Sequence, residues 1–252
     1  MKISINKKQK KIFYNFLGLI FIFLIWFILS NIYNNSLVIP KIEEVFGSLF
    51  KLLSTSRFYM LFFTMIFRII LTVIISLIIA TLLAMICFKS ERMYNFLNPL
   101  ITIMKTMPII AIIILLLLSI GMGLAPYVAT SFVIMPLIFE MVYASFKDIN
   151  PTITDDIKTV SNVNLNVLLK FYLPLVLPSI ITSLIQSFGL GLKVMLMAEF
   201  ISPRRNTFGA EISTCYNNLQ MPEVYAIIFV VVVVVFILDK LLKMFREKKQ
   251  LN

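Results

Sequence analysis

The sequence predicts an all-α integral membrane protein with about six transmembrane helices. Hydrophobic residues make up 60% of the 252 residues, which is above the roughly 45–50% of an ordinary soluble domain. They gather in runs that approach or exceed the roughly 18 apolar residues typical of a bilayer span. The net charge is +11, and the basic residues cluster at the chain ends and between the runs, as membrane topology requires. Membrane lipid is therefore an expected partner, and nucleic acid is not.

Residues 1–58 are expected to hold a first span and an extracytoplasmic amphipathic segment. A basic head precedes an apolar run at about residues 12–32, and no small-residue cleavage site follows it. We interpret this run as an uncleaved span and not as a removed signal peptide. Beyond it, Ile42, Val45 and Leu49 recur at helical spacing, which predicts a short helix lying at the membrane surface.

Residues 59–245 are expected to form the main transmembrane domain, and residues 246–252 a basic cytoplasmic tail. Lys105 and Pro108 interrupt the third apolar run, and GMGLAP predicts a tight turn after it. Spans 2 to 6 are predicted at about residues 59–88, 96–120, 127–146, 171–201 and 224–242.

The distribution of basic residues predicts the orientation of the chain. Six spans place both termini on one side, and if that side is the cytoplasm, the inner segments hold fifteen Lys and Arg residues against five in the outer segments. This excess is the positive-inside pattern of membrane proteins. It predicts cytoplasmic termini, and it places a polar segment at about residues 147–172 in the cytoplasm.

The polar segment predicts two short amphipathic helices separated at Ser161. Asp155 and Asp156 fall in the first or second turn of the first helix, depending on where that helix begins. Ile157 and Val160 then share one face. A solvated connector does not need such a face, but amphipathic segments also rest on lipid. The residues alone therefore leave docking onto a protein and contact with lipid both open.

The same segment resembles the cytoplasmic signature of permease subunits of binding-protein-dependent ABC importers. That signature is E-A-A, three residues, G, about nine residues, a hydrophobic residue and L-P. This sequence has DDI at residues 155–157, Ser161 at the glycine position, and Leu173 and Pro174 at the end. Asp156 and Ile157 thus replace the two alanines, so the loop is a divergent copy whose register carries the likeness.

The resemblance extends over about residues 38–245 and points to the nitrate/sulfonate/taurine branch of that family. Pro178 completes LPLVLP, which is similar to the L-P-x-x-L-P of the branch. Similar stretches are VIPKIEEV at 38–45, NPLITIMKTMP at 98–108, and GLGLKVMLMAEFI at 189–201, the last followed by FGAEI and YAIIF.

The resemblance implies a type I importer permease fold and a set of partners. A cytoplasmic ATP-binding cassette ATPase would dock on a coupling helix, an extracytoplasmic binding protein would deliver a small solute such as a sulfonate, taurine or nitrate, and the permease would work as a dimer. A homodimer is expected and a heterodimer stays open. The implied cellular location is the plasma membrane of a prokaryote. The implied functional residues are Asp155, Asp156, Ile157, Val160 and Ser161 for ATPase coupling, and Pro174 and Pro178 as a hinge between loop and span.

Charged and polar residues inside the apolar runs are candidates for the substrate path, because such residues usually face a bundle interior or an aqueous cavity. The candidates are Gln186, Lys193, Glu199 and Arg68. Lys193 suits an anionic solute; its alternative role is an ion pair with Glu199 across helices. Arg68 either faces the interior or reaches the membrane surface with its long side chain. For Lys105 we expect the latter.

The sequence does not predict an enzyme. It has no histidine, two cysteines and no phosphate-binding glycine loop, so we expect no catalytic residues, metal or cofactor. The alternative function is a self-contained secondary transporter or channel that uses Lys193, Arg68 and Glu199. That class predicts inverted repeats, which the sequence does not display. A membrane scaffold without transport would leave the intramembrane charges unexplained.

Overall fold

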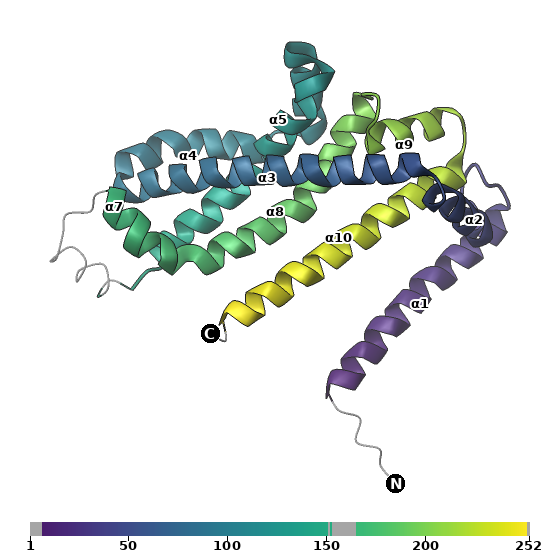
Figure 1. Ribbon diagram of the computed structural model, residues 1–252, viewed down its shortest axis with the longest axis horizontal. Helices are drawn as coiled ribbons and strands as arrows, with labels where there is room; N and C mark the ends of the chain where they lie inside the picture. Colours follow the sequence, from purple (N-terminus) through teal and green to yellow (C-terminus); the bar gives the residue numbers. More distant parts are fainter. Residues whose placement is uncertain (1–6, 151, 153–164, 251–252) are drawn as a thin grey trace, which may run out of the picture. The chain divides into compact units, whose positions relative to one another are not determined.

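The computed structural model describes residues 7–150, 152 and 165–250 of the chain. Helices dominate these residues, and no β-strand occurs among them, which confirms the predicted all-α class. The helices (Figure 1) are α1 Lys7–Tyr33, α2 Ile42–Leu53, α3 Ser56–Lys89, α4 Glu91–Thr106, α5 Ile109–Lys147, α7 Leu165–Val167, the π-helix η1 Leu168–Tyr172, α8 Leu173–Ile201, α9 Phe208–Asn217 and α10 Met221–Gln250.

Five helical stretches in the described part of the chain are long and apolar enough to cross a membrane. They lie in α1, α3, α5, α10 and the continuous helix formed by η1 and α8. The predicted third span is divided between two elements, because α4 ends before Pro108 and α5 begins after it. Proline lacks the N–H that a continuing helix needs.

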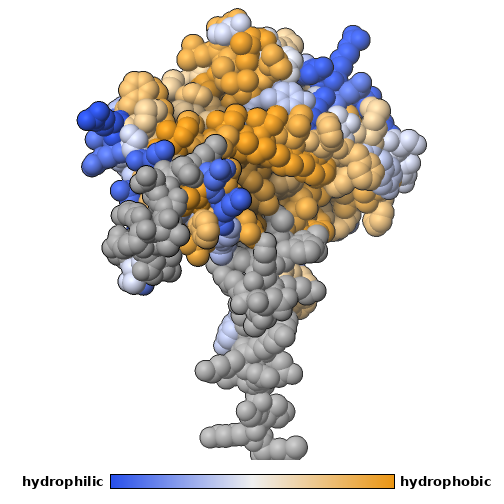
Figure 2. All heavy atoms as spheres, turned by 60° about the vertical axis from the view of Figure 1, so that its left-hand side comes forward, coloured by the Kyte–Doolittle hydropathy of each residue, from blue (hydrophilic) through white to orange (hydrophobic). Residues whose placement is uncertain are grey.

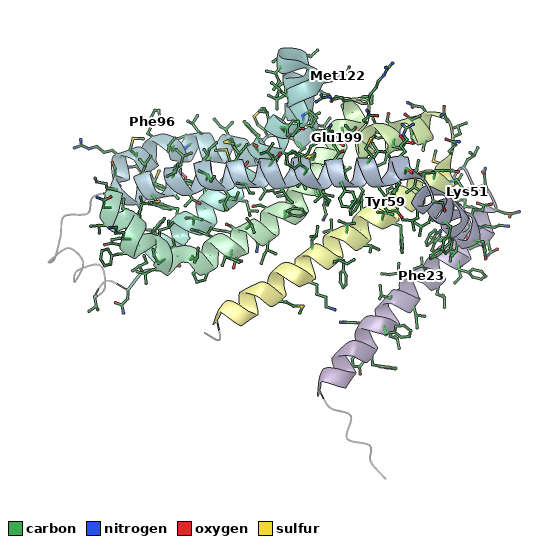
Figure 3. The ribbon with its side chains drawn as sticks, viewed as in Figure 1. Phe23, Lys51, Tyr59, Phe96, Met122 and Glu199 are labelled. Carbon is green, nitrogen blue, oxygen red and sulfur yellow. The ribbon has the colours of Figure 1, made fainter. Side chains whose placement is uncertain are left out.

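The predicted tight turn between spans 3 and 4 lies inside α5. Gly121 has φ 76° and ψ 173°, so α5 consists of two helices joined at a kink. A positive φ of this kind is readily adopted by glycine, which has no Cβ. The label on Met122 in Figure 3 marks this turn. The second part of α5 therefore corresponds to the predicted fourth span.

The chain divides into two compact units, and the first consists of Met1–Phe58 and Thr214–Val230. Its core contains Val45 and Leu49 of α2 and Ala226 of α10, with Trp26 of α1 packed against it. The Trp26 Nε1–H also donates a 3.0 Å hydrogen bond to the Pro40 carbonyl. The apolar face predicted for α2 is thus buried against protein in this unit.

The second unit, Tyr59–Ser213 and Val231–Asn252, brings α3, α5 and α8 together. They pack tightly at Gly191 of α8, where an added Cβ would lie 3.0 Å from Ile69 Cδ1 and 3.3 Å from Thr130 Cγ2. Ile69 and Thr130 are fully buried. Small residues at a crossing let helix backbones approach closely, so Gly191 sets the spacing of these three helices.

Large apolar side chains remain exposed on most of the long helices. In α1, for example, only 6% of the candidate span is buried. Figure 2 shows one face on which hydrophobic side chains form a broad surface, with hydrophilic side chains in smaller groups near its edges. Exposed apolar surface of this extent indicates contact with lipid or with another protein.

Candidate functional site: charged residues within the helix bundle

The predicted coupling residues lie outside the described residues. These are Asp155, Asp156, Ile157, Val160 and Ser161. The structure does describe the chain on either side of them. Lys147 ends α5 before the segment, and α7 begins after it at Leu165.

The predicted hinge prolines both lie within α8, and the chain stays helical through them. Pro174 occupies the first turn of α8, and Pro178 lies further inside. The irregularity comes just before Pro174, in the π-helix η1, where the Leu173 N–H donates to the Leu168 carbonyl. A proline ring clashes with the carbonyl four residues before it. A wider π turn at this point gives that carbonyl room, which accounts for its position.

An aromatic cluster joins three helix ends near this π turn. The Phe88 ring in α3 lies 5.2 Å from Phe146 in α5 and 5.3 Å from Tyr172 in η1, measured between ring centroids. Phe146 and Tyr172 are only 1% exposed. Phe146 lies next to Lys147, the last residue of α5. The cluster therefore ties both ends of the polar segment to α3.

Lys193 and Gln186 lie together on an open cavity of about 300 Å³. Phe188, Gly189 and Val235 line its apolar part, and Val235 comes from α10 in the same unit. Both polar side chains are exposed. Among the described residues, Lys193 has no ion-pair partner. The arrangement presents a cation and an amide beside an apolar wall, which suits recognition of a negative group on a small solute.

Arg68 and Glu199 form a separate, buried ion pair. Arg68 Nη1 donates to Glu199 Oε1 at 3.1 Å, and the Glu199 side chain is 2% exposed. Its second oxygen, Oε2, accepts from the Gly209 N–H at 3.2 Å. Figure 3 labels Glu199 where α8 lies close to α3. The alternative pairing of Lys193 with Glu199 does not occur, because Arg68 occupies the carboxylate.

Gly209 fits against Glu199 only because it has no side chain. A Cβ built there would lie 2.3 Å from Glu199 Cβ and 2.7 Å from the Glu199 carbonyl carbon. No real Cβ approaches atoms that closely. The carboxylate thus holds the start of α9 directly against the end of α8. Earlier in the chain, between α8 and α9, Arg204 Nη1 donates to the Gly123 carbonyl at 3.4 Å.

A second ion pair joins α4 to α5, and the sequence did not lead us to one of its members. Lys105 Nζ donates to Glu140 Oε1 and Oε2 at 2.7 and 2.9 Å. Lys105 was expected to reach the membrane surface; in the structure it binds Glu140. Glu140 could have been found from the sequence, because it is an acidic residue inside the apolar run PLIFEMVY. Ionisable residues inside predicted spans are functional candidates, which is how Lys193 and Glu199 were chosen.

These groups offer charges and hydrogen-bonding side chains, and no reactive centre is evident among them. Within the described ranges, no group of three or more Cys, Asp or Glu residues is arranged to hold a metal ion. The chain has no histidine to act as a base near neutral pH. The chemistry that the site offers is recognition through charge and shape.

Comparison with known proteins identifies the family. Residues 76–250 match the family described as the binding-protein-dependent transport system inner membrane component. The fold is similar to a chain in inward facing conformations of the MetNI methionine ABC transporter, with a TM-score of 0.55 and 11% identity, covering 73% of this chain and 95% of that one. It is also similar to a chain of a bacterial ABC transporter involved in the import of the acidic polysaccharide alginate, with a TM-score of 0.62, 14% identity and 96% coverage of both chains.

A search of curated protein sequences found no significant match. The two structural likenesses concern fold alone, whereas the family match covers well over half of the chain. With the helical architecture described above, it confirms the predicted type of permease. The chain belongs to the family of inner membrane components of binding-protein-dependent transport systems, with the fold of type I ABC importer permeases.

Proposed function

We propose that the chain is the membrane subunit of an ATP-driven importer, which moves a small solute delivered by an extracytoplasmic binding protein while a separate subunit hydrolyses ATP. The observation that carries this proposal is the family match over residues 76–250. The ATPase would dock on the segment at residues 155–161, whose register resembles the coupling signature. Two conformations of the membrane subunits would then alternate, and ATP would bias the balance between them.

The aromatic cluster supports this role for the segment. Phe146 and Tyr172 anchor its two ends, and Phe88 joins both to α3. A push on the segment would therefore reach α3, α5 and α8 together. On this proposal Pro174 and Pro178, beside the π turn, are the place where the loop bends relative to the span.

The solute is proposed to be a small organic or inorganic anion. The exposed Lys193 beside Gln186 supports a negative group, and LPLVLP at residues 173–178 supports the nitrate/sulfonate/taurine branch. Arg68 and Glu199 satisfy each other's charge, so we assign them to holding the path in shape and not to contact with the solute.

The assembly is proposed to contain two permease subunits in the plasma membrane of a prokaryote, with both termini in the cytoplasm. The excess of basic residues in the predicted inner segments supports the orientation. A homodimer is the simpler arrangement, because most oligomers consist of identical subunits with closed symmetry; a heterodimer with a related permease is the alternative.

Co-purification tests the proposed function. The chain would carry a C-terminal tag, native membranes would be solubilised in mild detergent, and mass spectrometry would identify the bound proteins. We expect an ATPase subunit, and an accompanying binding protein would indicate the solute. A homo-oligomer that lacks an ATPase, under conditions in which a control importer stays intact, would contradict the proposal and favour a self-contained transporter or channel.

The coupling segment has its own test within this experiment. Asp156→Arg or Ile157→Arg is expected to remove the ATPase from the purified complex, because either change places a large cation in the proposed interface. The control is Thr152→Arg, an exposed position outside the signature register. Normal ATPase recovery with both variants would overturn the assignment of the segment. Detergent gel filtration checks that each variant stays folded.

The alternative of a self-contained transporter or channel is not favoured. Of the three charges on which it would rely, Arg68 and Glu199 are paired with each other. The family to which the chain belongs is that of permeases from binding-protein-dependent systems.

A further inference from the structure

The Lys105–Glu140 ion pair is only half covered by this chain. Each side chain is 48% exposed. Glu140 lies in the candidate span Ile109–Lys147, seven residues before its end, which is about 10 Å along a helix. A carboxylate at that depth is costly in contact with lipid. The exposed half of the pair therefore faces water or another protein.

The surroundings of the pair have the character of a binding cavity. An open cavity of about 250 Å³ contains both charged groups, and Met104, Met107 and Leu137 contribute to its apolar walls. Small-solute sites commonly combine apolar walls with a few convergent polar groups.

This cavity and the Lys193 cavity share one lining residue. Leu190 of α8 lines both. Gln186, Leu190 and Lys193 are spaced four and three residues apart, so they share one face of the helix. The two cavities therefore open along the same face of α8, with Lys193 in one and the ion pair in the other.

We propose that Lys105 and Glu140 form a second charged site of the translocation path, which takes the negative group of a small anionic solute. In the absence of solute, Lys105 binds Glu140. As the solute moves along α8 from Lys193, Lys105 releases Glu140 and binds the negative group of the solute. With two cations and one carboxylate lining the two cavities, the path carries a net positive charge and favours anions. This inference rests on the proposed function and adds Lys105 and Glu140 to the path.

Cysteine accessibility tests whether the face lines water, and it needs no knowledge of the solute. The native Cys87 and Cys215 are first replaced by serine in the full assembly. Leu190→Cys is then labelled with a charged methanethiosulfonate reagent. We expect labelling at least about tenfold faster than at Ile78→Cys, an exposed apolar position on α3 assigned to lipid, because thiolate formation needs water. Leu137→Cys, beside the ion pair, is expected to react as Leu190→Cys does.

Equal rates at Leu190→Cys and Ile78→Cys would overturn the aqueous path along α8. Labelling of Leu190→Cys without labelling of Leu137→Cys would end the path at Lys193 and overturn the second site. Both results are obtained with Lys105 and Glu140 intact. Misfolding caused by a change in the ion pair therefore cannot produce either of them.

Charge selectivity tests the role of the pair itself. The readout is the labelling rate at Leu190→Cys with anionic ethylsulfonate reagent divided by the rate with cationic trimethylammonium reagent. We expect Lys105→Met to lower this ratio and Glu140→Gln to raise it, each about fivefold, because one charge about 8 Å away through water changes the rates of the two oppositely charged reagents by about twofold each in opposite directions. Arg204→Gln, a matched change of an exposed cation elsewhere, should leave it unchanged. A ratio insensitive to both pair variants would refute the second site.

The outcome for the proposed function is separate. Co-purification of an ATPase with an unreactive Leu190→Cys would leave the importer standing and remove this path. Rapid labelling without any ATPase would keep the path in a transporter of another kind.

Discussion

Glu199 is the most deeply buried member of the two ion pairs described above, with a side chain that is 2% exposed. Its two oxygens bind Arg68 and the Gly209 N–H. Removing one partner from such a pair leaves an unpaired buried charge and commonly costs roughly 3–5 kcal/mol of stability. The loss falls on the contact between α3, α8 and the start of α9.

We therefore expect Arg68→Met to lower the unfolding temperature of the purified protein sharply. Adding Glu199→Gln should recover part of the loss, because the double variant has no unpaired charge. Thermal unfolding in detergent, followed by fluorescence gel filtration, measures both. A single variant as stable as the parent would contradict the account of a stabilising pair.

Gly209→Ala should also destabilise the protein. The new Cβ would lie 2.3 Å from Glu199 Cβ, so the start of α9 must move away and the Gly209 N–H must lose its acceptor. Gly47→Ala is the control, because a Cβ at this helical position of α2 meets nothing within 4 Å. It should be neutral or stabilising by about 0.5–1 kcal/mol. The same unfolding assay compares the two, and equal effects would refute the steric argument.

At this scale the sequence marked several charged positions but not their partners. Arg68 and Glu199 stand 131 residues apart, and nothing in one sequence says that they meet. The pairing of Lys105 with Glu140 depends on how α4 packs on α5, which residue spacing within one helix does not determine.

At the scale of elements, the aromatic cluster stabilises the packing of α5 and η1 against α3. Phe146 is 1% exposed and stacks on Phe88. Phe146→Ala should cost about 3–5 kcal/mol, since it removes a buried ring and leaves a cavity. Phe96→Ala, at a ring that is 67% exposed, is the matched change and should cost far less. Thermal unfolding of the two variants would separate them; similar losses would count against the cluster.

The long helices could be predicted from hydrophobic runs, because a membrane span needs little more than length and apolar character. The break at Pro108 and the turn at Gly121 were also visible, since proline and glycine act locally. The continuity of η1 with α8 was harder to predict from the sequence. Two prolines in LPLVLP indicated a boundary, whereas the π turn lets the helix pass through them.

At the scale of the whole molecule, the predicted orientation makes a direct prediction. A fluorescent protein fused to the C-terminus should be fluorescent, and alkaline phosphatase at the same point inactive, because both report a cytoplasmic end. Arg205→Cys, in the predicted outer loop, should react with an impermeant reagent added to intact cells. An active phosphatase fusion would reverse the assignment that places residues 155–161 in the cytoplasm.

Family membership could be anticipated because the resemblance rested on register and spaced prolines over most of the chain. The solute could not, since charge alone does not distinguish one small anion from another. In the proposed assembly a separate binding protein delivers that solute, which leaves little of the choice in this sequence.

The π turn at η1 also has a rotational consequence. It inserts one residue beyond the α-helical repeat, and each residue in an α-helix turns the chain by about 100°. Leu165–Val167 in α7 are therefore offset in angle from the faces that α8 presents. Deleting Leu169 would restore the repeat and swing α7 by about that angle, with every other side chain unchanged. Removal of a single codon would thus rotate the side chains that α7 presents without changing any of them.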